Sequence, residues 1–415
     1  MPRASLTSCV ASLIALALPT LQAEDIASAF EDAIKGGTYG GMLRYRADAY
    51  DEDNGTSKPG LASTLRTSLY YQTKPFFGLT GFGELFHVAS IGNDNYFSAG
   101  ANGTAFGERD FIIDPAGMGV NQAYARFQPS VPVPVTITAG RQLWTINDET
   151  LVTASRYRQN MNRFDAFTGS IEPVKNLTVE AGHIVHNIDV TDTVVPMSTN
   201  VGNLAYALPG IGRAAVYGVV LDYDDAGKTD RTTVGARIDG PYKIDDQLSV
   251  IYELDYAKQT DSGDTTVEID ASMLTARAGV TYDQWYASVG YRVSSGVTDS
   301  SAMAYQSSDI GYPWPWRGNS EQLVFYPTQG LETLMVWVGG AVPKIDGLSF
   351  DVFYFDFKAA EDSTSFGSEI SGGLNYNITK RWSVYGLATK AMEGDEGNGA
   401  FRDAQRLTGM TTFTF

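Results

Sequence analysis

Apolar and polar residues alternate along the chain from about residue 39 to the last residue. Leu43 and Tyr45 fall on one face of an extended segment, and Arg44 and Arg46 fall on the other. This alternation is typical of a β-strand with one apolar and one polar face. The turn-forming sequence DEDNGTSKPG follows at 51–60, and a second alternating segment ends in the tight KPFFG at 74–78. The patterned part of the chain therefore begins with a predicted β-hairpin.

The same alternation predicts eighteen strands in all. Each is about ten residues long, the length of a strand that crosses a bilayer. We place them at residues 39–50, 61–72, 77–90, 119–128, 134–143, 162–170, 176–187, 200–208, 213–223, 231–239, 247–258, 270–281, 284–294, 331–341, 347–358, 367–378, 381–391 and 402–415.

The connections between these strands alternate in kind. One set is short and often carries Pro or Gly, whereas the other is long and acidic, with its longest members around 91–118, 144–161 and 295–330. Short turns on one rim, long loops on the other and an even strand count are features of bacterial outer-membrane barrels. The strand at 200–208 has the weakest pattern and is included partly to keep the count even. The sequence predicts an all-β, antiparallel, up-and-down transmembrane barrel with both termini in the periplasm.

The C-terminal stretch RDAQRLTGMTTFTF at 402–415 shows the same two faces and ends on an aromatic residue. Leu407, Phe413 and Phe415 share one face, and Arg406 and Thr408 share the other. A closing barrel strand places apolar side chains toward lipid and polar ones toward the lumen. We expect the chain to end in such a strand.

The first 23 residues differ from the rest. Arg3, an apolar run and a small residue at the end of LQA (21–23) indicate a secretory signal peptide, because the run is too short to span a bilayer as a helix. Cys9, the single cysteine, lies inside this segment, so no disulfide or cysteine metal site is expected after cleavage. We expect 1–23 to be the signal peptide, 24–37 a short periplasmic segment with one amphipathic helix, and 38–415 the barrel.

Composition agrees with a barrel more than with soluble domains. The chain has 43 Gly, 23 Tyr and 20 Phe, and no apolar run beyond the signal approaches the ~18 residues of a spanning helix. The formal net charge of −18 lies largely in the long connections. We expect contacts with outer-membrane lipid and lipopolysaccharide, and none with nucleic acid.

Catalytic and metal-binding patterns are weak. His183 and His186 are three apart on a predicted strand and point to opposite faces, which makes a poor ligand set. The Asp-rich loops lack the full pattern of a calcium loop. We expect no enzyme activity, no cofactor and no metal. Trp314 and Trp316, held between prolines, either stack on sugar rings at a pore mouth or pack their loop against the wall.

Arginines carry the strongest functional pattern. An arginine facing lipid costs about 2–4 kcal/mol near the bilayer midplane, so arginines on strands are expected to face the lumen. The candidate pore-lining arginines are Arg44, Arg46, Arg66, Arg126, Arg141, Arg158, Arg163, Arg237, Arg277, Arg292, Arg402 and Arg406. The candidate pore-lining acidic residues are Asp165, Glu180, Asp222, Glu253, Asp255 and Glu369.

Two interpretations of these charges stay open. Arginines paired with carboxylates across the lumen brace the barrel, whereas unpaired guanidinium groups form a row that attracts anions. We expect both, with a net basic constriction inside an acidic exterior.

GRQ at 140–142, SRYRQN at 155–160 and RFDAF at 163–167 resemble segments of the alginate-export-type outer-membrane porins. The likeness runs in order through nearly the whole mature chain, including LRYRADAYDED at 43–53 and VLDYDD at 220–225. The resemblance implies an 18-stranded monomeric barrel with an electropositive constriction that passes anionic polysaccharide. The family's pore-lining positions carry over to Arg46, Arg66, Arg126, Arg141, Arg158, Arg163 and Asp165.

The expected function is a passive channel for anionic solutes, such as uronate saccharides of the alginate type. A porin specific for small carboxylates or neutral sugars is the alternative within the same class. A hydrolase at the barrel rim and a structural barrel with a plugged lumen are alternatives from other classes. The substrate and the direction of transport stay open.

Overall fold

A computed structural model describes residues 23–395 and 401–415, apart from positions 101, 226, 299–301, 308–309 and 324–325. The predicted signal peptide lies outside the described residues, except for Ala23, which begins a helix. In the part of the chain described, no helix has the length and apolar character needed to traverse a bilayer.

One helix precedes eighteen strands. The helix is α2 (Ala23–Lys35). The strands are β1 (Thr38–Glu52), β2 (Gly60–Gln72), β3 (Leu79–Asn95), β4 (Gly117–Phe127), β5 (Val135–Gln142), β6 (Arg163–Val174), β7 (Leu177–Ile188), β8 (Val194–Leu208), β9 (Gly212–Leu221), β10 (Arg231–Lys243), β11 (Leu248–Asp261), β12 (Asp270–Tyr282), β13 (Trp285–Ser294), β14 (Leu331–Ala341), β15 (Leu348–Lys358), β16 (Ser365–Thr379), β17 (Trp382–Glu393) and β18 (Ala404–Thr414).

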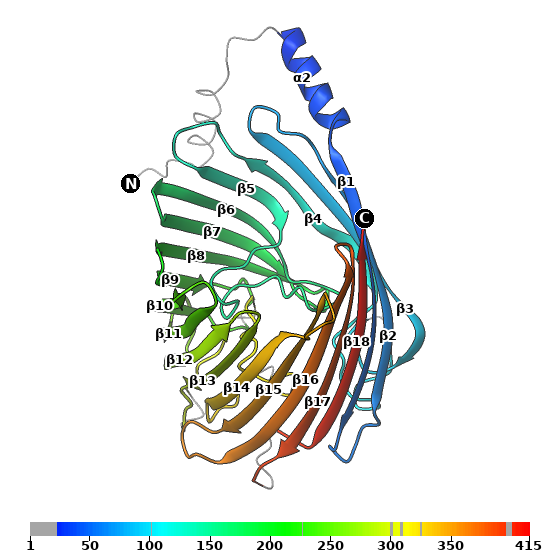
Figure 1. Cartoon of the computed structure of the whole chain (residues 1–415), viewed down its shortest axis with the longest axis vertical. Coiled ribbons are helices and arrows are strands. Elements are labelled where there is room, and N and C mark those ends of the chain that lie inside the picture. The colour runs from blue at the N-terminus through cyan, green and yellow to red at the C-terminus, as the bar shows by residue number, and fades with distance from the viewer. Residues whose placement is uncertain are drawn as a thin grey trace.

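The strands form one closed antiparallel barrel (Figure 1). Each strand pairs with its neighbours in the sequence, and β1 closes the sheet by pairing with β18 as well as with β2. The start of β1 and the end of β18 lie at the same end of the barrel, since Met42 pairs with Thr414. We call this the terminal end, and the opposite end, which carries the long connections, the loop end. The predicted fold class and strand count are confirmed.

Every predicted strand is present, with differences mainly at the ends. The largest is β8, which begins at Val194 rather than at residue 200. Its extra residues pair with the end of β7 beyond a bulge, so that His186 faces Pro196. Proline donates no ladder hydrogen bond and is tolerated beside such an irregularity. The strand with the weakest sequence pattern is therefore present, and it is longer than the pattern indicated.

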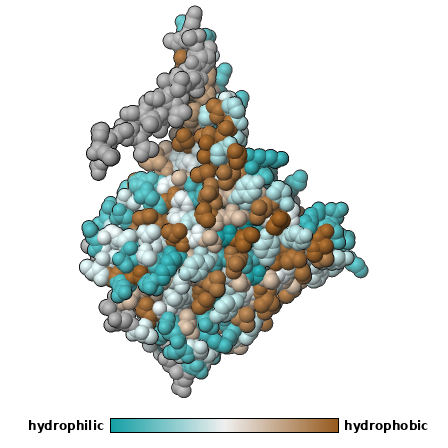
Figure 2. Space-filling model, turned by 90° about the vertical axis from the view of Figure 1, so that its left-hand side faces the viewer, coloured by the Kyte–Doolittle hydropathy of each residue, from teal (hydrophilic) through white to brown (hydrophobic). Residues whose placement is uncertain are grey.

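The outer face of the barrel is apolar, as the alternation predicts. Leu69, Leu85 and Leu407 are all more than half exposed. Figure 2 shows apolar side chains spread over one outer face of the barrel, below the helix. On β18, Arg406 and Thr408 face inward and are buried, so the predicted division of this strand between two faces is confirmed.

Helix α2 rests on the short turn between β2 and β3. The rings of Phe30 and Phe76 meet edge to face at 5.6 Å, and the backbone N–H of Lys74 donates to the carbonyl of Ala33 (2.9 Å). The chain then passes close to β2, where a Cβ on Gly37 would lie only 2.2 Å from the Tyr71 hydroxyl oxygen. The absence of a side chain at Gly37 therefore allows the chain to pass close to Tyr71 between the helix and β1.

Two long connections fold back into the barrel. The 143–162 loop joins β5 to β6, and the 295–330 loop joins β13 to β14. Both contact inward-facing strand residues: Arg44 donates to the carbonyl of Arg156 (2.9 Å), and Thr333 donates to the carbonyl of Trp316 (2.9 Å). Figure 1 shows these loops inside the barrel. Both add buried apolar side chains to its interior, among them Ile146, Val152, Tyr305 and Trp316.

Candidate functional site

The barrel lumen is the candidate site, and its most buried part is an ion cluster on β1 and β18. Asp48 accepts hydrogen bonds from Arg46 (2.7 Å) and from Arg406 (3.0 and 2.7 Å). Glu321 of the 295–330 loop pairs with both Arg406 and Arg158. Burial by itself would raise the pKa of Glu321, but Arg158 and Arg406 outweigh it and lower that pKa. The cluster fastens both loops to the barrel wall.

Two more wall arginines hold the 143–162 loop through its backbone. Arg44 donates to the carbonyl of Arg156 and to the side-chain oxygen of Gln159 (3.1 Å). Arg66 donates to the carbonyl of Gln159 and is fully buried. Buried guanidinium groups need such acceptors, because desolvation without partners is costly. The partners of these two arginines bind the loop to β1 and β2.

A second ion cluster lies across the lumen on β10 to β13. Asp148 of the 143–162 loop pairs with Arg237 (2.9 Å) and Arg292 (3.1 Å). Glu253 lies 3.2 Å from Arg237 and 3.3 Å from Arg277. Burial alone would raise the pKa of Asp148, but Arg237 and Arg292 outweigh it and lower the pKa to about 2. The carboxylate is therefore ionised at neutral pH and balances two arginines.

The two tryptophans of the 295–330 loop have different environments. Trp316 is only 3% exposed, with the guanidinium of Arg292 placed 4.8 Å from its ring centroid. Trp314 is 41% exposed and meets Trp337 of β14 edge to face at 5.8 Å. Backbone N–H groups just beyond, at Asn319 and Ser320, donate to Glu369 of β16. Trp316 thus packs its loop against the wall, one of the two predicted alternatives.

Arg126 on β4 has surroundings unlike those of the other wall arginines. It lies toward the terminal end, is partly exposed, and has its guanidinium carbon 4.8 Å from the ring centroid of Tyr124. Its Nε donates a long hydrogen bond to Thr138 (3.4 Å). Among the described residues, no carboxylate oxygen lies within 4 Å of its nitrogens. Arg126 therefore presents an unbalanced positive charge to the lumen.

A cavity of about 230 Å³ opens on the inner wall near the terminal end. Its lining consists of Tyr157, Asn375, Ser383, Tyr385, Met410 and Thr412. All but Tyr157 are inward-facing strand residues, and Tyr157 comes from the 143–162 loop. Free space in the lumen therefore lies between this loop and the terminal end.

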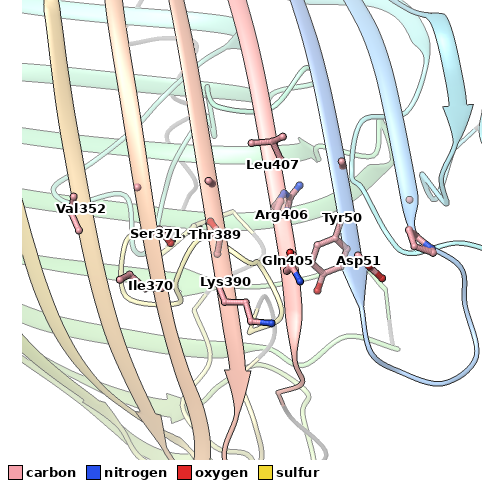
Figure 3. A pocket seen from close by; sticks show the side chains of 15 residues that line it. Tyr50, Asp51, Val352, Ile370, Ser371, Thr389, Lys390, Gln405, Arg406 and Leu407 are labelled. Carbon is pink, nitrogen blue, oxygen red and sulfur yellow. Dashed lines mark hydrogen bonds between the residues drawn. The ribbon is translucent and has the colours of Figure 1, made fainter.

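A larger hollow, of about 780 Å³, lies on the outside of the barrel. Figure 3 shows its lining on β15 to β18 and β1. Lys390 and Leu407 are exposed there, whereas Arg406 points inward and is buried. The hollow is an open depression, and Gly372 and Ala388 in its lining have no long side chains to cover the sheet. It belongs to the lipid-facing surface and is separate from the path through the lumen.

Most of the predicted pore-lining residues do face inward. Inward-facing strand positions hold Arg44, Arg46, Arg66, Arg126, Arg237, Arg277, Arg292, Arg406, Glu180, Glu253, Asp255 and Glu369. Arg158 lies in the 143–162 loop inside the barrel, Arg163 begins β6 with its guanidinium near the ring of Phe86, and Arg402 precedes β18 with Glu52 at 3.9 Å.

Three predicted pore-lining residues face outward instead. Arg141 and Asp165 form a two-bonded pair (2.8 and 2.9 Å) on the same sheet face as Phe167, which is 61% exposed. Their mutual pairing neutralises both charges at the outer edge of the barrel. Asp222 is exposed just beyond β9, because it follows the inward-facing, buried Leu221 and so takes the outward position of the alternation.

Several lumen residues were missed by sequence reasoning. The alternation placed Asp48 on the same face as Arg44 and Arg46, but Asp48 was not among the candidate pore-lining residues. Asp148 and Glu321 lie in loops, where alternation gives no facing. The histidines are not brought together in a site: His183 contacts Asn200 (3.1 Å), and His186 lies 3.5 Å from Asp165. Within the described ranges, no cluster of His, Cys, Asp and Glu has the arrangement of a metal site.

No protein-family model and no curated protein sequence matches the chain. Solved structures do match. Acinetobacter baumannii OccAB3 aligns with a TM-score of 0.72 at 12% identity over 92% of this chain and 100% of that one. A. baumannii OccAB4 aligns with a TM-score of 0.69 at 13% identity, over 91% of this chain and 98% of that one. Pseudomonas aeruginosa OpdK, solved with vanillate, aligns with a TM-score of 0.69 at 12% identity, over 92% and 99%.

OpdK is described as an outer-membrane protein. TM-scores of 0.67–0.72 at 11–13% identity establish a shared fold, and the resemblance to the alginate exporters is not shown. The closed barrel and its apolar outer face place the protein in the outer membrane of a Gram-negative cell, with the fold of a porin.

Proposed function

We propose that this protein is a passive channel that carries small organic carboxylates through the outer membrane. The observation that supports this most directly is the partly exposed, unpaired guanidinium of Arg126. The other inward-facing strand arginines predicted to line the lumen each contact a carboxylate or a loop carbonyl. One uncompensated charge in a narrow lumen attracts anions, and the forked donors of a guanidinium match a carboxylate.

The filled loop half of the lumen favours small solutes. The 143–162 and 295–330 loops are fastened by buried ion clusters, which narrows the path on the loop side of Arg126. A uronate polymer needs a wide and continuous lumen, whereas a solute of a few carbon atoms does not. The structure of OpdK with vanillate, a small aromatic carboxylate, agrees with this size class. Because Arg126 is partly exposed to water, it binds such anions weakly and releases them, as conduction requires.

The test uses the full mature protein in planar bilayers and liposomes. We expect a reversal potential under a KCl gradient that indicates anion preference, and faster liposome swelling in small carboxylates than in a neutral sugar of similar size. Arg126→Ser is expected to reduce the anion preference by about two- to fivefold, the effect of roughly one unit charge near 4 Å in water. Arg141→Ser removes the same charge from the outer face and serves as the matched control.

Cation preference, or equal swelling in carboxylates and neutral sugar, would contradict the proposal. Block of the conductance by oligo-mannuronate, weakened by Arg126→Ser, would instead favour the uronate-saccharide alternative. Absence of any conductance would favour a structural barrel with a plugged lumen.

A further inference from the structure

Three aromatic rings form a stack beside Arg126. Phe82 of β3 stacks on Tyr124 of β4 with ring centroids 5.1 Å apart and planes 13° from parallel. Tyr70 of β2 stacks on the other side of Phe82, at 5.7 Å and 20°. The guanidinium carbon of Arg126 lies 4.8 Å from the Tyr124 centroid. The order across the wall is therefore three rings followed by one guanidinium group.

The sheet register places this stack inside the barrel, toward the terminal end. Phe82 and Tyr124 are direct cross-strand partners, and Tyr70 pairs with Glu84, the next inward position on β3. The alternate positions Leu69 and Leu85 are exposed on the outer face. Cross-strand partners and diagonal neighbours lie within reach of aromatic side chains, so the stack is fixed by strand pairing.

A second stack, on β15, shows what such rings do when they are covered. Phe353, Phe355 and Phe357 stack at 5.8 and 5.7 Å, within 8° of parallel, and are at most 3% exposed. They form part of the buried core. In the stack beside Arg126, Tyr70 is 36% exposed and the other two rings are partly exposed. A stack of similar geometry is therefore left uncovered where the lumen is open.

We propose that Tyr70, Phe82, Tyr124 and Arg126 form a binding site for a planar aromatic monocarboxylate of the benzoate type. This inference rests on the proposed function, for which it names the substrate class. The ligand's carboxylate accepts hydrogen bonds from the Arg126 guanidinium, and its ring lies against the lumen-facing edges of the stack. Aromatic rings favour this edge-to-face contact.

Glu84 explains why one carboxylate is expected and not two. It lies across from Tyr70 and accepts hydrogen bonds from Asn121 and Gln122 (2.8 Å each), and it is 4.0 Å from Arg66. The carboxylate of Glu84 therefore lies beside the stack and does not pair with Arg126. A second carboxylate at the ring end of the ligand meets this negative charge and is disfavoured.

The experiment compares two blockers of similar size that differ in planarity. Benzoate and cyclohexanecarboxylate are titrated against the single-channel KCl current of the full mature protein. An aromatic contact predicts that benzoate blocks at about three- to tenfold lower concentration. Phe82→Leu and Tyr124→Leu, made separately, should each abolish most of this ratio and leave block by cyclohexanecarboxylate unchanged. Heat-dependent mobility on gels verifies that each variant forms a barrel.

Two further variants separate the site from general effects. Tyr385→Leu removes a lumen-facing tyrosine outside the stack, and the benzoate ratio should stay at its wild-type value. Arg126→Lys keeps the charge but loses the planar fork, so both blockers should weaken while the channel stays anion-selective. A ratio near one in the wild type, or a ratio unchanged by both leucine variants, would overturn the aromatic site. Such a result leaves the carboxylate channel intact, because that proposal depends on anion preference and swelling rates.

Discussion

The two halves of the lumen use the same residue type in opposite ways. Toward the loop end, Arg46 and Arg406 share Asp48 and are almost completely buried. Toward the terminal end, Arg126 stacks on Tyr124 and meets no carboxylate among the described residues. The strands supply arginines to both halves, but loops reach only one of them. The arginines that the loops cover therefore brace the barrel, whereas Arg126, which no described loop covers, keeps an unpaired charge.

The largest effect is expected from removing the carboxylate of Asp48, which Arg46 and Arg406 share. Asp48→Asn leaves Arg46 and Arg406 without their common counter-charge in a buried site. Breaking a buried ion pair in this way costs about 3–5 kcal/mol. We expect a lower urea midpoint for unfolding in detergent and a larger, noisier conductance as the 295–330 loop loosens. Arg126→Ser should leave the free energy of unfolding within about 0.5 kcal/mol of the wild-type value. An equal loss of unfolding free energy in both variants would contradict the distinction between the two halves of the lumen.

A pH titration tests the ion pairs that Asp148 of the 143–162 loop makes with Arg237 and Arg292. The pKa of Asp148 is lowered from its ordinary value of 3.8 to about 2 in the folded protein. A depressed carboxylate pKa adds stability that is complete above the unfolded value and is lost as the pH falls through the folded value. Loop opening, seen as conductance steps, should therefore be constant from pH 7 to about 5 and increase between about pH 4 and 2. Asp148→Asn should show frequent steps at every pH, and a wild-type transition near pH 6 would exclude Asp148 as its cause.

The smallest effect is expected outside the lumen. Arg141→Ala breaks the pair with Asp165 on the outer face, where both side chains are partly exposed. Exposed ion pairs contribute about 0.2–1 kcal/mol. We expect a small shift of the urea midpoint and no change in single-channel conductance. A clear change in anion selectivity would mean that this pair communicates with the lumen after all.

Local patterns were sufficient for the strands and for most side-chain orientations. Arg44 and Arg46 alternate with Leu43 and Tyr45 on β1, and each faces as predicted, because a lipid-facing charge is too costly. The helix at 24–35 also followed from its local pattern. The sequence failed at Arg141, where charge alone indicated the lumen but the register with Phe167 places it outside.

Local sequence patterns could not predict which residues pair with the arginines. Asp48 lies 358 residues from Arg406, and Arg44 bonds a loop more than 110 residues away. The aromatic stack likewise depends on the register of three strands, which places Tyr70, Phe82 and Tyr124 side by side. Nothing in a periodic pattern specifies which residues of two strands lie opposite each other across a bulge.

By itself, the sequence determined a closed barrel of eighteen strands and the inward direction of most arginines. Both follow from a bilayer that forces backbone pairing and excludes charge from the outer face. The tertiary structure alone decided which arginines are neutralised, since that depends on the strand register, which brings Asp48 to Arg406, and on where the 143–162 and 295–330 loops fold. Loop paths are set by contacts between distant residues rather than by a repeating pattern. The same contacts leave Arg126 and its aromatic neighbours uncovered in the lumen.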